Sequence, residues 1–188
     1  MFRIITCPEW GAAPPKNPIT VIPHKAPGII FHHTASHLRQ IDTPKDESFK
    51  EACQYARDIQ SFHMGNSRGW NDSGHNFLVT RGGHILQGRW LTVSQIENKR
   101  MVISAHCPGF NDWIGIEHEH MSGEQPTKVQ LDASAWLQAW IALQYGSTQA
   151  LRVDPHKAHF ATACPDNLVK FIPEVKAKAQ ALINVMAT

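Results

Sequence analysis

The sequence lacks the features that would assign it quickly to several common classes. No CxxC pair occurs among its four cysteines, and their wide spacing suggests neither a zinc ribbon nor a dense disulfide framework. Basic and acidic residues nearly balance at a formal net charge of +2. A protein that follows a nucleic-acid backbone shows a clustered excess of Lys and Arg, which is absent here. We therefore expect no nucleic-acid partner.

Signals that direct a chain to a membrane are also missing. No segment approaches about 18 consecutive apolar residues, so we expect no membrane insertion. The start, MFRIITCPEW, has neither a long apolar run nor a small-residue cleavage site, and it does not read as a signal peptide. If Cys164 binds a metal, the other three cysteines cannot all pair within the chain, which favours synthesis in a reducing cytosol.

The composition is that of one globular domain. The chain has 188 residues, of which 42% are hydrophobic, and this is enough for a real core. We find no internal repeat and no linker, so residues 1–188 are expected to form a single domain. Residues 1–27 are Pro-rich and are predicted to wrap the outside irregularly. Nothing in the sequence argues for an oligomer, and a monomer is expected.

Hydrophobic periodicity predicts strands interleaved with helices. The predicted strands are 28–34, 75–80, 84–90, 101–106 and 112–120, and the RGG at 81–83 predicts a hairpin. The predicted helices are 43–64, 127–146 and 165–186, the last with a break or restart at Pro173. This order indicates an α/β domain with a central mixed β-sheet flanked by helices.

Two of the helices carry more detailed signals. The helix over 43–64 begins with Thr and Pro, and its apolar residues at helical spacing are Phe49, Ala52, Ala56, Ile59 and Phe62. The helix over 127–146 opens with a predicted capping box of Thr127 and Gln130 and stops at Gly146. Its predicted apolar stripe is Trp136, Ala139, Trp140 and Leu143.

The 12 histidines raise the expectation of a metal or acid–base site. His156 and Cys164 stand eight positions apart in HKAHFATACPD and could converge on one metal ion if the loop doubles back. A third ligand is sought at the end of a rigid element. The strand IIFHHT offers His32 and His33, which point to opposite faces, so one can face a cleft while the other packs behind it. Two His and one thiolate form a known ligand set for catalytic zinc.

The motifs WGA, IIFHHTA, GHNFLVTRGGHILQGRW, AHCPGFNDWIGIE and H…TACPD occur in an order that resembles one family. This family comprises the zinc-dependent N-acetylmuramoyl-L-alanine amidases and the related peptidoglycan recognition proteins. The resemblance covers roughly residues 9 to 172. It implies a mixed sheet with flanking helices and a Zn²⁺ ion at the floor of a substrate groove. By position it implies His32, His156 and Cys164 as ligands, with His33 in a supporting role.

The resemblance also implies a reaction. The family's substrate is peptidoglycan, and the bond cut joins N-acetylmuramic acid to the L-alanine of the stem peptide. A general base must take the proton of the attacking water and return it to the departing amine. Many relatives have Tyr at the position of His75, whereas another branch has Glu in an IGIE strand, where this chain has Glu117. We expect Glu117 as acid/base and His75 as a secondary catalytic group, with Glu119 a rival of the same strand parity.

Two further residues are assigned by resemblance. His106 stands where relatives have a His beside the substrate groove, and it is expected to bind substrate. Thr162 replaces a Lys found in some relatives and is also placed in the substrate site. Its hydroxyl cannot supply the positive charge that a Lys would bring to a developing oxyanion.

Three rival functions have weaker support than that of an enzyme, a zinc-dependent amidase. A recognition protein without turnover usually lacks the Cys ligand, and Cys164 is present. The HExxH motif of many metalloproteases and the deaminase pattern are absent, and a closed structural zinc site takes four protein ligands, whereas this sequence offers three.

The biological role is open between a phage endolysin and a cytosolic enzyme that recycles wall fragments. The Pro-rich start, compact length and TACPD resemble phage lysis enzymes. Such an enzyme is made in the host cytoplasm and reaches the wall through a separate pore, either alone or as one module of a longer lysin.

Overall fold

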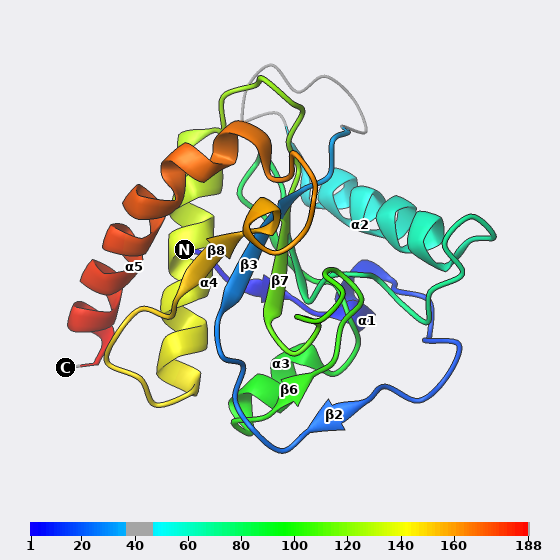
Figure 1. Ribbon diagram of the computed structural model, residues 1–188, viewed down its shortest axis with the longest axis horizontal. Helices are drawn as coiled ribbons and strands as arrows, with labels where there is room; N and C mark the ends of the chain where they lie inside the picture. Colours follow the sequence, from blue (N-terminus) through cyan, green and yellow to red (C-terminus); the bar gives the residue numbers. More distant parts are fainter. Residues whose placement is uncertain (37–46, 188) are drawn as a thin grey trace.

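The computed structural model describes residues 1–36 and 47–187. They form a six-stranded mixed sheet with helices on both faces, as Figure 1 shows. Its strands, in the spatial order β1-β5-β4-β7-β3-β8, are β1 (Ile4–Ile5), β5 (Ile85–Gln87), β4 (Phe77–Val79), β7 (Ile114–His118), β3 (Ile29–His33) and β8 (Val153–Pro155). Strands β4 and β5 form the predicted antiparallel hairpin, and the other neighbours pair in parallel. The predicted α/β class with a mixed central sheet is confirmed.

One face of the sheet carries the main hydrophobic core. Because successive side chains of a strand alternate between faces, Ile29 and Phe31 of β3 lie on the same side as Ile114 and Ile116 of β7, and all four are at most 2% exposed. Helices α4 (Lys128–Gln144) and α5 (Ile172–Met186) cover this side (Figure 1). Removal of this apolar area from water is the main force that holds the two helices to the sheet.

On the opposite face of the sheet, apolar side chains cover only part of the surface. Helices α1 (Cys7–Trp10) and α2 (Phe49–Met64) pack on Leu78 of β4 and Leu86 of β5. Elsewhere on this face, the start of β3 packs against Trp113 and Cys107. The carboxyl ends of β3 and β7 on this face carry polar side chains instead, and they line a pocket.

Helix α2 begins later than predicted. Ser48 caps it, its hydroxyl accepts a hydrogen bond from the Glu51 amide, and Glu51 returns a contact to the Ser48 backbone. This capping box fixes the start at Phe49 and overrides the Thr-Pro signal; residues 47 and 48 are not helical, and 43–46 lie outside the described residues. Ala52 and Ala56 are buried as predicted, but Phe49 and Phe62 are 45% and 55% exposed.

Helix α4 starts and stops close to prediction, but two of its details differ. Thr127 accepts from the Gln130 amide, yet the Gln130 side chain does not return to the cap and donates instead to the Val79 and Glu119 carbonyls. Gly146 follows the helix with φ +69°. The predicted stripe faces the core: Ala139 is fully buried, and Trp136, Trp140 and Leu143 are partly buried and pack against the core. The buried side of α4 is wider than this stripe, because the helix packs against both the sheet and α5.

The amino-terminal segment also differs from prediction. Residues 1–27 are not only an outer wrapping, because Ile4–Ile5 pairs with β5 and extends the sheet. Trp10 is 1% exposed, and its indole N–H donates to the Gln87 carbonyl at 2.8 Å. Strand β2 (Val21–Ile22) pairs with β6 (Met101–Val102) in a separate small sheet. The predicted strand 101–106 is therefore reduced to two residues.

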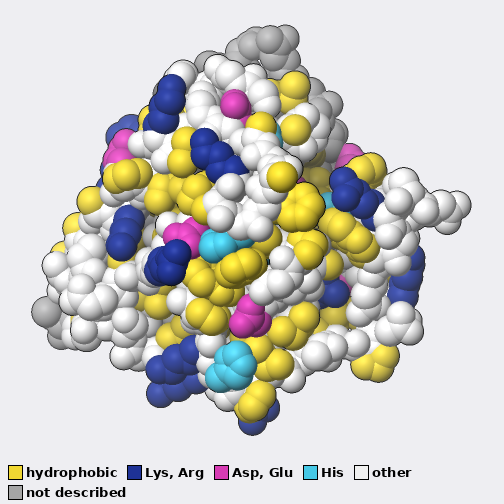
Figure 2. Space-filling view, in the orientation of Figure 1, with side chains coloured by type: hydrophobic (Ala, Val, Ile, Leu, Met, Phe, Trp, Pro, Cys, Tyr) yellow, Lys and Arg dark blue, Asp and Glu magenta, His cyan; other side chains and the backbone are white. Residues whose placement is uncertain are grey.

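Helix α3 (Thr92–Glu97) and the 3-10 helix η2 (His156–Ala158) were not predicted, and the 3-10 helix η3 (Asp166–Phe171) forms the first part of the predicted helix 165–186. Helix α3 precedes β6, and η2 and η3 precede α5. The predicted restart at Pro173 is confirmed, since Pro173 occupies the first turn of α5. Within the described residues, no helix is long and apolar enough to cross a membrane. On the face in Figure 2, Lys and Arg side chains are scattered rather than gathered.

Two glutamines of α4 provide a matched test of this packing. Gln130 and Gln138 are both fully buried, but Gln130 donates two hydrogen bonds while neither amide atom of Gln138 has a partner among the described residues. We expect Gln130→Leu to lower the free energy of unfolding by about 1–2 kcal/mol, and Gln138→Leu to leave it unchanged or raise it. Denaturant unfolding measures both; equal losses from the two variants would contradict this account.

Candidate functional site

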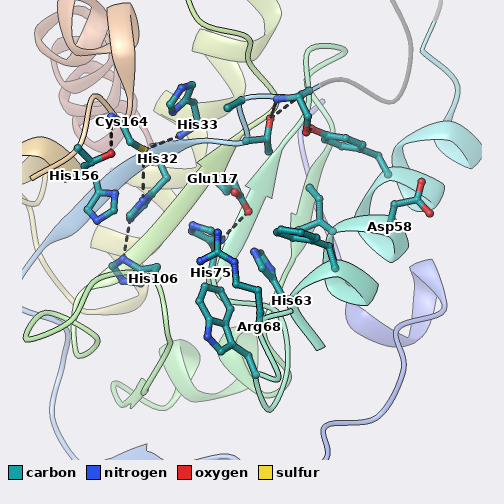
Figure 3. Close-up of a pocket in the computed structure, with 18 residues that line it drawn as sticks. His32, His33, Asp58, His63, Arg68, His75, His106, Glu117, His156 and Cys164 are labelled. Atoms are coloured by element: carbon teal, nitrogen blue, oxygen red, sulfur yellow. Dashed lines mark hydrogen bonds and ion pairs between the residues drawn. The ribbon is translucent and has the colours of Figure 1, made fainter. Parts of the chain in front are cut away.

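A pocket of about 700 Å³ opens at the carboxyl ends of β3, β7 and β8. Its walls combine segments that are far apart in the sequence: the end of β3, the last turns of α2, the residues before β4, the end of β7, and η2 with the loop that follows it. Figure 3 shows the polar side chains pointing into it. Open α/β sheets commonly place their ligands outside the carboxyl ends of the strands.

Strand register sets the floor of this pocket. His32 of β3 pairs with Glu117 of β7, and Glu117 pairs in turn with Leu78 of β4. Residues paired in register on one sheet face stand side by side. The imidazole of His32 and the carboxylate of Glu117 are therefore neighbours, and they are only 3% and 7% exposed.

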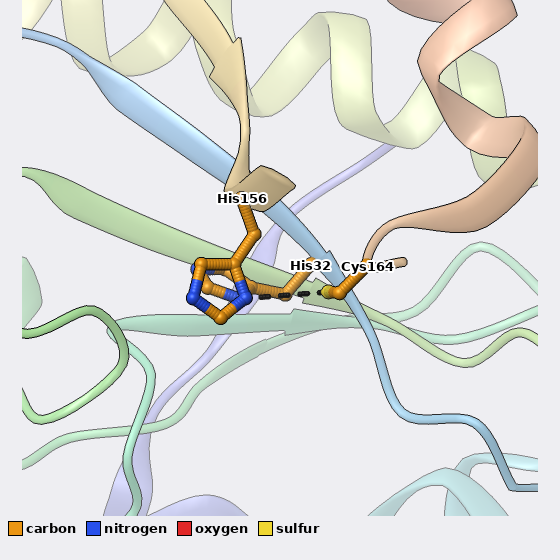
Figure 4. A group of neighbouring side chains, drawn as sticks. All are labelled: His32, His156 and Cys164. Atoms are coloured by element: carbon orange, nitrogen blue, oxygen red, sulfur yellow. Dashed lines mark hydrogen bonds between the residues drawn. The ribbon is translucent and has the colours of Figure 1, made fainter. Parts of the chain in front are cut away.

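His32, His156 and Cys164 converge at one end of the pocket (Figure 4). One donor atom from each lies within 4.8 Å of the others, which is a spacing that can hold a metal ion. The Cys164 Sγ atom lies 3.8 Å from His32 Nδ1, and the ring centroids of His32 and His156 are 4.3 Å apart. The structure thus brings together the three residues predicted as ligands.

The hydrogen bonding and protonation of these three residues are compatible with metal binding. His156 Nε2 is buried and has no hydrogen-bond partner among the described residues. Burial lowers the pKa of His32 well below its usual value and also lowers the pKa of His156, so both rings are neutral and can coordinate. Burial raises the pKa of the Cys164 thiol to about 12, and metal binding would displace its proton.

Two hydrogen bonds, one from a backbone amide and one to a side-chain hydroxyl, hold Cys164 in place. The His33 N–H donates to Cys164 Sγ at 3.3 Å, and the Cys164 N–H donates to the Thr162 hydroxyl at 3.2 Å. His33 directs its ring toward Ser122, with Nε2 3.4 Å from the serine oxygen. His33 therefore supports the trio, and Thr162 both lines the pocket and orients the loop that carries the thiol.

Glu117 and His75 form a buried pair beside the trio. His75 Nδ1 lies 2.6 Å from Glu117 Oε2, and the His75 ring meets the His32 ring edge-on with centroids 4.7 Å apart. Burial alone would raise the pKa of the Glu117 carboxyl, but the contact with His75 outweighs it and lowers that pKa below its usual value. Glu117 is therefore an ionised carboxylate at neutral pH, able to accept a proton.

Glu119 lies elsewhere. Strand β7 ends at His118, so the alternation used to predict equal orientation of Glu117 and Glu119 stops before Glu119. The Glu119 carboxylate accepts from the Arg81 N–H at 3.0 Å, and Glu119 is not among the residues that line the pocket. The structure thus separates the two glutamates that the sequence left as rivals.

His106 lines the pocket next to His32, as expected, but its ring nitrogens face other protein groups. Its Nδ1 atom is 2.8 Å from His32 Nε2, and its Nε2 atom is 3.0 Å from the Trp113 carbonyl oxygen. His106 is 6% exposed, and burial lowers its pKa to about 3, which keeps the ring neutral. Both of its nitrogens are engaged within the protein, so in this arrangement neither is available for the predicted contact with substrate.

Sequence reasoning missed His63. This residue in the last turn of α2 is 5% exposed and stacks on Trp70, with ring centroids 4.7 Å apart. The spacing of Ala52, Ala56 and His63 on one helical face was the available signal. A ring nitrogen of His63 lies within 4.8 Å of donor atoms of His75 and Glu117.

The hydrogen bonding of His63 argues against a second metal ion there. The Gly74 N–H donates to His63 Nδ1 at 3.1 Å, so the neutral ring carries its hydrogen on Nε2. A metal ligand needs a free lone pair. His63 is thus a hydrogen-bond donor on the wall beside the Glu117–His75 pair, and burial lowers its pKa to about 4.

Aromatic side chains form the wall on the α2 side. Trp70 and Phe62 line the pocket, and the guanidinium of Arg68 lies 5.1 Å and 5.5 Å from their ring centroids. Trp90 lies away from this wall: it donates its indole N–H to the Ala13 carbonyl and packs beside the α1–α2 cluster.

Comparison with known proteins gives consistent matches. The family described as N-acetylmuramoyl-L-alanine amidase matches residues 23–167. The mouse protein named N-acetylmuramoyl-L-alanine amidase is 27% identical over 166 residues, which cover 85% of this chain and 28% of that protein. Peptidoglycan-recognition protein LE of Drosophila melanogaster is 33% identical over 112 residues, 59% of this chain and 27% of the other. The chain spans only about a quarter of these two relatives.

The fold also matches solved structures over nearly its whole length. Wild-type Drosophila PGRP-LB has a TM-score of 0.75 and 30% sequence identity, with 92% of this chain and 93% of that chain covered. A mutant of PGRP-LB in complex with tracheal cytotoxin has a TM-score of 0.72 at 30% identity, covering 88% and 89%.

A buried histidine behind the pocket gives a pH-dependent prediction. His118 Nδ1 lies 3.0 Å from the His32 carbonyl oxygen and Nε2 lies 2.9 Å from the Ser134 hydroxyl, and burial lowers the pKa of His118 to about 4. Between about pH 6.5 and pH 4 the unfolded chain binds a proton that the folded chain refuses, so the free energy of unfolding falls as the pH falls.

In the metal-free protein, we expect His118→Gln to reduce this pH dependence by up to about 1.4 kcal/mol per pH unit, because glutamine does not titrate. Urea unfolding of both proteins at several pH values between 7 and 4 measures the difference. Identical slopes for the two proteins would contradict the neutral state of His118.

Proposed function

The chain belongs to the N-acetylmuramoyl-L-alanine amidase family, and from that premise we propose that it hydrolyses the amide bond between N-acetylmuramic acid and L-alanine in peptidoglycan, with zinc as cofactor. The observation that carries this proposal is the convergence of His32, His156 and Cys164 beside the buried Glu117–His75 pair in one open pocket.

The donor set suits a catalytic zinc ion. Two imidazoles and one thiolate leave a fourth position free, whereas structural zinc sites are closed by four protein ligands. When bound, zinc supplies Lewis-acid polarisation of the scissile carbonyl and increases the acidity of water. The remaining work falls to the side chains around it.

Glu117 is the proposed acid and base. Its ionised carboxylate takes the proton of the attacking water and delivers it to the departing alanine amine. His75 holds Glu117 Oε2 at 2.6 Å and so fixes the direction of the carboxylate. His63, with its hydrogen on Nε2, adds a donor on the same wall. Thr162 contributes a neutral hydroxyl, so no Lys charge is available to a developing oxyanion at this position.

Recognition without turnover is the alternative function, because several relatives are named peptidoglycan-recognition proteins. Two features favour catalysis here. Cys164, the proposed thiol ligand, lies close to His32 and His156, and Glu117 stands in register beside His32. Binding of a wall fragment is part of both functions, and a related PGRP-LB was solved with tracheal cytotoxin.

For the biological role we propose lysis of the bacterial wall by a phage endolysin or its amidase module, released from the host cytoplasm through a separate pore. A recycling amidase would act on soluble fragments rather than on polymer. Comparison of rates on intact peptidoglycan and on soluble muropeptides separates these roles, and activity confined to fragments would refute the lytic role.

The first experiment is digestion of purified peptidoglycan with and without a zinc chelator. We expect new free alanine amino groups that appear only with metal, and no new reducing sugar ends. Protein that sediments with the polymer but releases no alanine amines would instead be a recognition module.

Substitution of Glu117 tests the acid/base role. We expect Glu117→Gln to retain zinc and to lose about 10²–10⁴-fold in kcat, because the amide cannot accept the proton. Glu119→Gln is the matched control, since that carboxylate faces the Arg81 backbone and not the pocket; folded protein with this change should keep its activity. Undiminished turnover by Glu117→Gln would refute Glu117 as the general base and assign that role to His75.

Substitution of Cys164 tests the metal site. We expect Cys164→Ser to weaken zinc binding measured by competition with a chromogenic chelator, because a hydroxyl is a poorer zinc ligand than a thiolate. Cys107→Ser, at a cysteine in the small cluster with Ile30, is the control. Full zinc occupancy of Cys164→Ser under the same competition would refute the ligand assignment.

A further inference from the structure

The imidazole of His32 uses its two nitrogens in different directions. Nδ1 lies 3.8 Å from Cys164 Sγ, on the side of the metal-binding trio. Nε2 lies 2.8 Å from His106 Nδ1, and the other nitrogen of His106 lies 3.0 Å from the Trp113 carbonyl oxygen. A continuous series of contacts therefore links the Trp113 carbonyl, through His106 and His32, to the proposed metal site.

The Trp113 carbonyl and the proposed metal site determine which ring nitrogens in this series of contacts carry a hydrogen. A carbonyl oxygen only accepts, so His106 Nε2 must carry the hydrogen that it donates to Trp113. His106 Nδ1 and His32 Nε2 share one hydrogen, and Cys164 Sγ lies on the side of His32 Nδ1. His32 can offer Nδ1 to a metal ion there only when its own hydrogen is on Nε2. His32 Nε2 is therefore the donor, and His106 Nδ1 accepts.

From this series of contacts we propose that His106 is a positioning residue that holds His32 in the Nε2–H tautomer, with the Trp113 carbonyl as its anchor, so that Nδ1 is the atom offered to the metal. The inference rests on the metal site of the proposed function, but it assigns a role to a residue outside the ligand set. An imidazole ligand whose second nitrogen is hydrogen-bonded is fixed in both tautomer and orientation.

Gly115 makes the arrangement possible. A Cβ atom at this position of β7 would lie 2.5 Å from His106 Cδ2 and 2.6 Å from Cγ, well inside contact distance. The His106 ring thus lies directly against the backbone of β7, two residues from Glu117. Any larger side chain at 115 would push the ring away from His32, Trp113 or both.

The anchor itself is held by the fold. The Trp113 N–H donates to the Phe110 carbonyl at 3.0 Å, and the next residue, Ile114, donates to Gly28 at 3.0 Å as β7 begins beside β3. The Arg152 guanidinium lies 5.3 Å from the centroid of the Trp113 ring. The Trp113 carbonyl, at which this series of hydrogen bonds ends, therefore belongs to a turn that is held by the start of the central strand β7.

The first measurement uses the unmodified, metal-free protein. Histidine ¹⁵N resonances, assigned with a His32→Gln variant, report which ring nitrogen carries the hydrogen. We expect His32 to be protonated on Nε2 and His106 on Nε2 as well. Protonation of His32 on Nδ1 would overturn the inference, and this test needs no substitution of His106.

The second measurement is zinc affinity without substrate, by chelator competition. His106→Phe keeps a ring of similar size but removes both hydrogen bonds, and we expect affinity to fall about 10–100-fold. His106→Gln keeps an amide oxygen that can accept from His32 and an N–H₂ that can donate to Trp113, so it should recover most of the loss. His84→Phe, on the β4–β5 hairpin away from the pocket, is the control.

The outcomes separate the two proposals. Wild-type zinc affinity in His106→Phe would overturn the positioning role while leaving the amidase proposal intact. Failure of the wild-type protein to bind zinc would refute the proposed metal site and the positioning role together.

Discussion

The parallel pairing of β3 with β7 is the constraint on which the pocket depends. It puts His32 opposite Glu117, and the same pairing continues from Glu117 to Leu78 of β4. A shift of either strand by one residue would move all of its side chains to the other face. A shift of β3 would turn His32 toward α4 and Phe31 toward the pocket, and a shift of β7 would do the same to Glu117 and Ile116. The hydrophobic core beneath α4 and α5 thus fixes the register of the polar residues above it.

The polar face is possible because α2 covers only part of the sheet. Its apolar residues pack on β4 and β5, and its last turn brings His63 to the pocket wall. Several imidazoles are buried there, which costs free energy unless each is hydrogen-bonded. His63 receives the Gly74 N–H, and His106 contacts the Trp113 carbonyl; on the opposite face of the sheet, His118 contacts Ser134 of α4. Burial keeps these rings neutral, and the contacts hold them in defined orientations, as preorganised ligation and proton transfer require.

Much of the fold could be predicted from local patterns. The hairpin, the strands that end in His33 and His118 and the helix capped by Thr127 follow from alternation and capping, because these signals act between neighbouring residues. The errors arose where distant contacts or a competing local signal decided the outcome. Ser48 and Glu51 formed the cap of α2 in place of the Thr-Pro signal, and the Gln87 carbonyl drew Trp10 into the core.

By itself, the sequence determined the chemistry that is available: two histidines and a cysteine at a spacing suited to a metal, and a glutamate on a strand with the right parity. Only the tertiary structure decided how these groups are used. It turned Glu119 to the Arg81 backbone, added His63 from the end of α2, and placed His106 next to His32. These outcomes depend on where strands end and on which carbonyl or amide faces each ring. Such relations join residues far apart in the chain, and local sequence patterns do not encode them.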